Sequence, residues 1–179
     1  MTGKRPARRG TTVVAVIALL LSLAGWGWFA TEAARTGWWT FGEHVAVGPE
    51  EQGWASIDTL SVRLTSAGRA VGLEEEPPAG YVFLALDLQV ESTETELFRM
   101  CDVEVRDAQG RLFRAGREVP STDPYESSLT CGTSDPEEDP VPTTASMLVL
   151  VPVDAELTSL RVVSREFPPA RFIELPLPS

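Results

Sequence analysis

The sequence has few of the residue types that most often perform chemistry. Its 179 residues include one histidine, His44, one lysine, Lys4, two cysteines and no asparagine. A single imidazole excludes a metal site built from several histidines, and any catalytic triad would have to use His44. Confinement of lysine to position 4 excludes Schiff-base chemistry in the rest of the chain. The absence of asparagine excludes N-glycosylation.

Catalytic sequence motifs are also missing. There is no GxSxG nucleophile elbow, no P-loop and no GxGxxG fingerprint. Most carboxylates fall in predicted loops, where contact with solvent is expected to leave the pKa of a carboxyl group near its ordinary value. We therefore expect a protein that is not an enzyme, binds no cofactor or metal, and uses His44 as an ordinary polar residue.

The charge is distributed unevenly along the chain. The overall net charge is −11, but residues 1–30 carry only the basic side chains Lys4, Arg5, Arg8 and Arg9. The remaining residues hold 11 basic and 26 acidic side chains, a net charge of −15. Such an acidic body is repelled by phosphate backbones, which argues against nucleic-acid binding.

An apolar run covers residues 13–30 and is interrupted only by Ser22, Gly25 and Gly27. With residues 11 and 12 it reaches about 30 Å as a helix, the thickness of a bilayer core. We predict a transmembrane helix over 11–30, with Trp26, Trp28 and Phe29 at the outer interface. The four basic residues keep the tail 1–10 in the cytoplasm, so the rest lies outside. The alternative is a signal peptide cleaved after Ala24 or Ala33.

The chain after the apolar run divides into two predicted parts. Residues 31–53 show no helical period and are expected to form a juxtamembrane segment with an edge strand at 43–47. Trp38 and Trp39 there rest on the membrane interface or pack on the domain. Residues 54–179 show the alternation of strands, with a helical turn at 154–157.

The clearest predicted strand covers residues 81–91. Its inward face would carry five aliphatic residues and its outward face Tyr81 and Phe83. Further strands are expected at 60–65, 101–106, 112–113, 147–153, 160–163 and 171–175, with a hairpin turn at 107–110. Seven to nine short strands indicate an all-β antiparallel sandwich.

Three stretches carry a resemblance to a known family. They are Gly-Tyr-Val-Phe-Leu-Ala-Leu-Asp-Leu at 80–88, Val-Arg-Asp-Ala-Gln-Gly-Arg-Leu-Phe at 105–113 and Leu-Val-Leu-Val-Pro-Val-Asp-Ala at 148–155. With the basic tail and the apolar helix, the chain resembles bacterial membrane-anchored, extracytoplasmic Ig-like domains of the DUF4352 or telokin-like type. The excess of arginine over lysine favours a GC-rich, actinobacterial source. The resemblance implies an Ig-like sandwich and a location, and no activity.

The two cysteines, Cys101 and Cys131, are expected to be oxidised outside the membrane. Their disulfide would close a loop of 31 residues and stabilise the fold by about 3–4 kcal/mol. We interpret it as a structural link, and a redox switch is the alternative.

Residues 121–144 form an acidic stretch without a basic residue, predicted as one long loop. It could be simply solvated, bind a basic partner or hold a metal, although it lacks the spacing of an EF-hand. The candidate contact residues are the acids of this stretch and the outward aromatics of the clearest strand: Asp123, Glu126, Asp135, Glu137, Glu138, Asp139, Tyr81 and Phe83.

The sequence favours an accessory or scaffolding role, in which the sandwich binds another envelope or membrane protein through its acidic loop or edge strands. The alternative is a module that binds or senses a small molecule or an envelope polymer, with Tyr81 and Phe83 as the wall of its pocket.

Overall fold

The computed structural model describes residues 8–178, so Lys4 and Arg5 lie outside the described part. The chain divides after Phe41 into a helical unit and a sandwich unit. In the helical unit, α1 (Arg8–Ala30) is followed by α2 (Glu32–Phe41). Arg8 and Arg9 belong to the first turn of α1.

Helix α1 has the length and composition of a membrane span. Its segment Thr12–Ala30 has 19 residues and a mean hydropathy of 2.2. Near its end Trp26, Trp28 and Phe29 are all exposed. Length and hydropathy alone do not separate an anchor from a signal sequence, because both require an apolar helix near the N-terminus.

Helix α2 differs from the expectation of a segment without helical structure. It continues α1 through backbone bonds across Thr31: the Thr31 N–H donates to the Gly27 carbonyl at 3.1 Å, and the Arg35 N–H donates to the Thr31 carbonyl at 2.9 Å. Arg35 Nη2 also donates to the Trp28 carbonyl at 2.8 Å, and its guanidinium lies 3.5 Å from the Trp28 ring centroid. A ten-residue helix shows too few turns for a clear period, and here its start is stabilised by the preceding helix.

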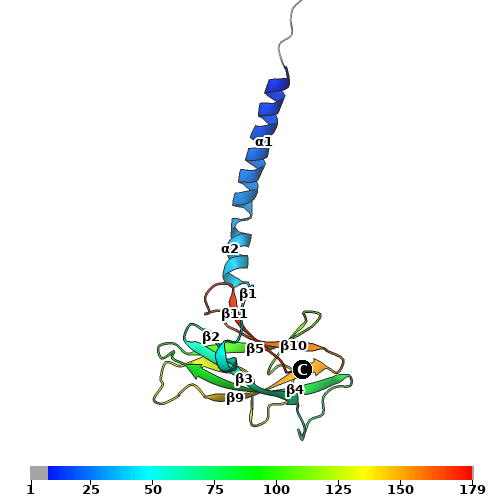
Figure 1. The fold of residues 1–179 in the computed structure, drawn as a ribbon, viewed down its shortest axis with the longest axis vertical. Coiled ribbons are helices and arrows are strands. Elements are labelled where there is room, and N and C mark those ends of the chain that lie inside the picture. Colours follow the sequence, from blue (N-terminus) through cyan, green and yellow to red (C-terminus); the bar gives the residue numbers. More distant parts are fainter. Residues whose placement is uncertain (1–7, 179) are drawn as a thin grey trace, which may run out of the picture. The chain divides into compact units, whose positions relative to one another are not determined.

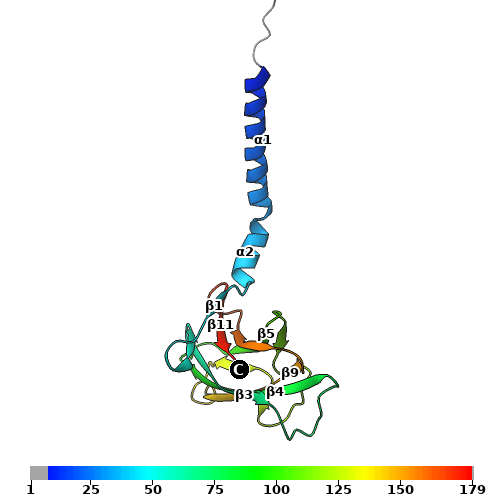
Figure 2. The same ribbon diagram turned by 45° about the vertical axis from the view of Figure 1, so that its right-hand side comes forward.

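The sandwich unit consists of two sheets that face each other (Figures 1 and 2). One sheet has the order β2 (Ala55–Ile57), β3 (Leu60–Arg69), β4 (Tyr81–Ser92), β9 (Thr144–Pro152) and β7 (Tyr125–Glu126). The other has the order β1 (Val45–Val47), β11 (Arg171–Pro176), β10 (Leu157–Val163), β5 (Arg99–Asp107) and β6 (Leu112–Arg114), and β8 (Leu129–Gly132) also pairs with β5. A short 3-10 helix, η1, covers Glu51–Gly53.

The core lies between the sheets and follows the two-residue period of the sequence. Leu86, Leu88 and Val90 of β4 are buried, as are Val103 and Val105 of β5. The predicted β-sandwich is therefore confirmed. The described part has eleven strands instead of seven to nine, because β2, β7 and β8 were not predicted: with three, two and four residues they are too short to show a clear period in the sequence. Two pairings, β1 with β11 and β7 with β9, are parallel.

The prediction that Phe83 is exposed is wrong. Phe83 is 3% exposed, whereas Tyr81 is 42% exposed. The segment between β3 and β4 folds over this face of β4, and a cavity of about 230 Å³ between them is lined by Leu73, Pro77 and Phe83. The Ala70 N–H donates to the Phe83 carbonyl at 2.8 Å. The outward face of the strand is thus apolar at this position because the segment between β3 and β4 covers it.

The predicted helical turn at 154–157 is also not found. A turn at 153–154 leads directly into β10, which begins at Leu157. The Ala155 N–H donates to the Pro152 carbonyl at 3.1 Å, a bond that closes one tight turn and does not propagate.

Candidate functional site

One end of the sandwich collects the features that point to function. The strand registers bring the start of β1, the starts of β5 and β11 and the ends of β8 and β10 to this end. We call it the β1 end, because the chain enters the sandwich there. Three connecting segments meet at this end: 93–98 before β5, 133–143 after β8 and 164–170 after β10.

The first residues of the sandwich unit already form contacts at the β1 end. Glu43 accepts a charge-assisted hydrogen bond from Arg161 Nη2 at 2.5 Å. The backbone N–H groups of His44 and Val45 donate to the Ala170 carbonyl at 2.9 and 2.8 Å. Only Gly42 lies between the end of α2 and the first of these contacts.

Three large apolar side chains are exposed at the β1 end. Leu97, Phe98 and Met100 are 47%, 52% and 41% exposed, and we call them the Phe98 patch. Arg99 and Cys101, between and after them, are buried instead. Strand alternation is therefore kept, but the charged residue faces the interior and the aromatic residue faces solvent. The sequence patterns did not predict this patch. The feature that could have indicated it is the order of Phe98 and Arg99, which puts the charged residue at an inward position of the alternation and the aromatic residue at an outward one.

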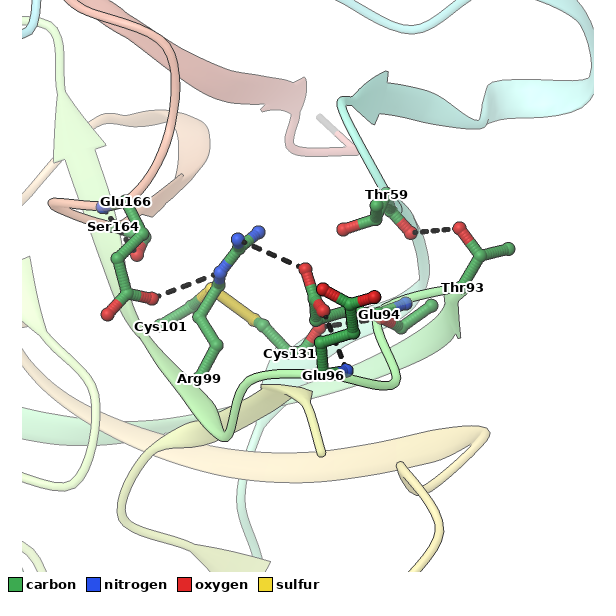
Figure 3. A network of polar contacts seen from close by, with 10 residues as sticks. Thr59, Thr93, Glu94, Glu96, Arg99, Cys101, Cys131, Ser164 and Glu166 are labelled. Atoms are coloured by element: carbon green, nitrogen blue, oxygen red, sulfur yellow. Dashed lines mark hydrogen bonds and ion pairs between the residues drawn. A yellow bond between two sulfur atoms is a disulfide. The ribbon is translucent and has the colours of Figure 1, made fainter. Parts of the chain in front are cut away.

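The buried Arg99 side chain fixes the backbone beneath the patch (Figure 3). Its Nε donates to Glu166 Oε2 at 3.0 Å, and its Nη2 lies 3.4 Å from Glu94 Oε2. Figure 3 shows the two carboxylates on either side of the guanidinium, beside the disulfide. Glu94 Oε1 also accepts from the Glu96 N–H at 3.0 Å. Through Arg99, the first residue of β5, this Arg99 cluster thus holds segment 93–98 and segment 164–170 together.

The Cys101–Cys131 disulfide gives the second fixed point. It joins β5 to β8, and both cysteines are buried in the core. Next to it, a Cβ on Gly132 would lie 2.7 Å from Glu94 Cγ and 2.8 Å from the Leu97 carbonyl oxygen. The approach of segment 94–97 to β8 therefore requires glycine at this position. The predicted disulfide is present, and its burial fits the structural interpretation.

The acidic stretch 121–144 is not one long loop, contrary to prediction. It contains β7 and β8, which sequence patterns could not reveal because they have two and four residues. Asp123 is exposed just before β7, and Glu126 is half-buried within β7. The other four acids, Asp135, Glu137, Glu138 and Asp139, are exposed in one acidic turn after β8. The six predicted acids therefore form two groups instead of one.

The acidic turn lies next to the Phe98 patch segment. The Thr133 N–H lies 3.4 Å from the Glu94 carbonyl, and Thr133 Oγ1 accepts from the Asp135 N–H at 3.1 Å. Asp135 closes the turn through its backbone and side-chain oxygens, which accept from Asp139 and Glu138 at 2.8 and 3.1 Å. Exposed carboxylates and exposed apolar side chains thus occur together at the β1 end.

Two carboxylates elsewhere have lowered pKa values, and both have structural causes. Hydrogen bonds from the Ser66 and Ser146 hydroxyls lower the pKa of Asp87 against the opposing effect of desolvation. Desolvation also acts to raise the pKa of Asp107, but hydrogen bonds and charge from Arg111, with the Gln109 N–H, outweigh it and lower the pKa. Asp107 thereby closes the β5–β6 turn. Within residues 8–178, no group of three or more histidine, cysteine, aspartate or glutamate side chains is placed to hold a metal.

Half of the ten arginines in the sandwich unit form ion pairs with carboxylates of the described residues. The five arginines that form ion pairs with carboxylates are Arg99, Arg106, Arg111, Arg114 and Arg161. Arg161 is buried, pairs with Glu104 and Glu43, and lies 4.1 Å from the Phe172 ring centroid. Since acidic residues greatly outnumber basic ones after residue 30, the charge left for partners is negative.

Comparison with known proteins gives similarity of fold only. No family model and no curated protein matches the sequence. Among solved structures, the secreted protein MPT63 from Mycobacterium tuberculosis is 11% identical, with a TM-score of 0.41 over 73% of this chain and 97% of that one. An uncharacterised β-sandwich protein from Clostridium difficile is 12% identical, with a TM-score of 0.37 over 76% of this chain and 96% of that one.

Proposed function

We propose that this protein is a non-enzymatic, single-pass membrane protein whose extracytoplasmic sandwich binds another envelope or membrane protein through the Phe98 patch. The observation that carries the proposal is the exposure of Leu97, Phe98 and Met100 on a backbone fixed by a disulfide and a buried ion cluster. Apolar groups exposed on a rigid support, beside polar groups, are typical of protein interfaces. Rigid support lowers the entropy lost on binding.

The compartment follows from three features together. Helix α1 contains a 19-residue apolar segment. Basic residues precede it and no acid does, which keeps the N-terminal side in the cytoplasm. A buried disulfide joins the only two cysteines, and such bonds persist in oxidising compartments. These features support an anchored domain outside the membrane.

The short connection also restricts where the partner can be. Between the Cα atoms of Phe41 and Glu43 the chain spans at most about 7 Å, two residue steps. A covalent connection this short to a membrane helix favours a partner in the same membrane. Anionic lipids fit poorly as the occupant of the patch, because the acidic turn beside it would repel them.

The alternative function, binding of a small molecule or envelope polymer, loses one of its two predicted wall residues. Phe83 lies under the segment that joins β3 to β4. Tyr81 remains exposed, without the aromatic partner that the alternative required.

The proposal can be tested in native membranes with a photo-crosslinking amino acid in the full-length protein. The probe replaces Phe98, and a matched control replaces Val71, which is 84% exposed on the segment between β3 and β4. We expect position 98, and not position 71, to form an adduct with one distinct polypeptide. Adducts only with lipid, only with a second copy of this chain, or equally from both positions would contradict it.

Anchoring is tested separately by extraction of the same membranes with alkaline carbonate. Retention of the full-length chain in the pellet is the expected result. A soluble chain shortened at Ala24 or Ala33 would show that the apolar helix is a cleaved signal and would contradict the single-pass arrangement.

A further inference from the structure

A groove begins where the Phe98 patch ends. It has a volume of about 380 Å³, and its lining includes Met100, Thr130 and residues 119–121 and 125–128. Met100 therefore belongs both to the patch and to the groove. Gly116 (φ +69°) also lines the groove, and a Cβ there would overlap the backbone of Ser127, so this part of the lining is closely packed.

Glu126 is the charged residue among the groove-lining side chains. It is half-buried on β7, and no ion pair to its carboxylate is formed by the residues that the structure describes. A partly desolvated carboxylate without a counter-charge gains more from a bound cation than an exposed one does. Glu126 thus contributes a negative charge to the groove that no ion pair within the described residues neutralises.

The remaining lining suits the end of a basic side chain. Ser121, Ser127 and Ser128 contribute hydroxyl oxygens that can accept from N–H groups. Tyr125 and Met100 contribute surfaces against which an alkyl stem can pack. Arg117, the nearby basic residue on the same segment, is exposed and does not line the groove.

We propose that the groove receives a lysine or arginine side chain of the partner polypeptide, while apolar residues beside it in the partner cover Leu97 and Phe98. The inference rests on the proposed function, because it names the recognition element of the same partner. A single carboxylate is a poor divalent-metal site, since such ions take six or more oxygen ligands. Phosphate-bearing ligands would be repelled by Glu126 and Asp123.

The experiment uses full-length protein in detergent micelles and a displayed library of random peptides. The library is selected in parallel on the wild type, on Glu126→Gln and on Glu118→Gln. Glu118 is exposed, close in sequence and outside the groove lining, so its variant is a control for loss of general negative charge. We expect lysine or arginine at one fixed position next to apolar residues on the wild type and on Glu118→Gln. On Glu126→Gln, the enrichment of the basic residue should fall at least tenfold.

A second pair of variants tests the location independently of charge. Ser127→Trp fills the mouth of the groove, whereas Ser134→Trp places the same side chain on an exposed position outside it. The synthetic form of the most enriched peptide should bind the Ser127→Trp protein at least tenfold more weakly and the Ser134→Trp protein unchanged. Near-ultraviolet circular dichroism of each variant confirms that the fold is kept.

Several outcomes would overturn the inference. These are enrichment of peptides without a basic residue, equal enrichment on Glu126→Gln, or no enrichment on the wild type. Failure here is distinguishable from failure of the proposed function. A polypeptide adduct at position 98 in membranes, together with any of these outcomes, would keep the partner and remove the cation groove.

Discussion

Phe83 lies on a strand of one sheet and Phe98 directly before a strand of the other sheet, and their environments are opposite. Phe83 points outward from β4 and is 3% exposed, because the segment between β3 and β4 covers it. Phe98 precedes β5 and is 52% exposed, although Arg99 next to it is buried and forms ion pairs with Glu94 and Glu166. The cover on Phe83 is held by main-chain bonds at Ala70, Tyr81 and Val153.

The difference separates two uses of an aromatic side chain. At Phe83 the ring stabilises the fold, since it has been removed from water within the chain itself. At Phe98 the fold holds the backbone and leaves the ring in water. Exposure on a fixed backbone is therefore the basis of the contact role proposed for Phe98, whereas an apolar side chain on a strand does not support such a role by itself.

The largest expected loss of stability follows substitution of Phe83, the buried ring of the two. Phe83→Ala should lower the free energy of unfolding by about 3 kcal/mol, the lower end of the range for buried aromatics, because its cover is a surface segment. Phe98→Ala should change it by less than about 0.5 kcal/mol. Urea denaturation of both variants checks this. Equal losses would show that the two rings contribute alike to stability.

Removal of the disulfide tests the rigidity on the Phe98 side. The variant with Cys101→Ala and Cys131→Ala should be less stable by about 3 kcal/mol, since its unfolded chain regains the freedom of a closed loop. The same urea experiment, with and without reductant, gives the value. If reduction of the wild type leaves the midpoint unchanged, the bond does not fix this end of the sandwich.

The Arg99 cluster should contribute somewhat less. Arg99→Met leaves the largely buried carboxylate of Glu94 without its cation, which should cost about 2 kcal/mol. Glu166→Gln should cost less than about 1 kcal/mol, because the Glu166 side chain is 44% exposed. Thermal unfolding of both variants at equal concentration tests the order. The reverse order would mean that segment 164–170, and not Glu94, holds Arg99 in place.

The smallest expected effect concerns Asp87, on the same face of β4 as Phe83. Its pKa is lowered in the folded protein by the Ser66 and Ser146 hydroxyls. Because the unfolded chain then binds the proton more readily, Asp87 contributes stability above its ordinary value of 3.8, and this is lost as the pH falls toward the lowered pKa. Asp87→Asn should flatten the decline of unfolding free energy between about pH 5 and about pH 3. Urea denaturation across this pH range checks the prediction, and a variant with the wild-type slope would contradict it.

The sequence predicted the long strands and missed three of the short ones, β2, β7 and β8, for a physical reason. In β4, β5 and β9, nine to twelve residues show the alternation that burial of one face imposes. In β7 and β8, two and four residues carry no such pattern. These strands form because neighbouring strands have backbone groups free to pair with them. Which strands become neighbours is decided by the tertiary structure. The acidic stretch was consequently predicted as one loop, and the separate position of Glu126 was not visible.

The candidate site was less predictable than the fold. The contact residues proposed from sequence included Phe83, which the fold covers, and omitted Leu97, Phe98 and Met100. A strand pattern gives two faces and does not say which later segment covers either of them. The exposure of Phe98 depends on the inward turn of Arg99, whose ion pairs use Glu94 of the same segment and Glu166 of segment 164–170.

The sequence by itself determined the apolar helix, the uneven charge, the alternation of the core strands and the only possible cysteine pair. These properties depend on the order of residues within short stretches, or on composition. The tertiary structure alone decided which aromatic side chains stay in water, where the acidic residues gather and which carboxylate faces the groove without a counter-charge. Those properties arise from contacts between segments far apart in the chain, where one segment decides the solvent exposure of another.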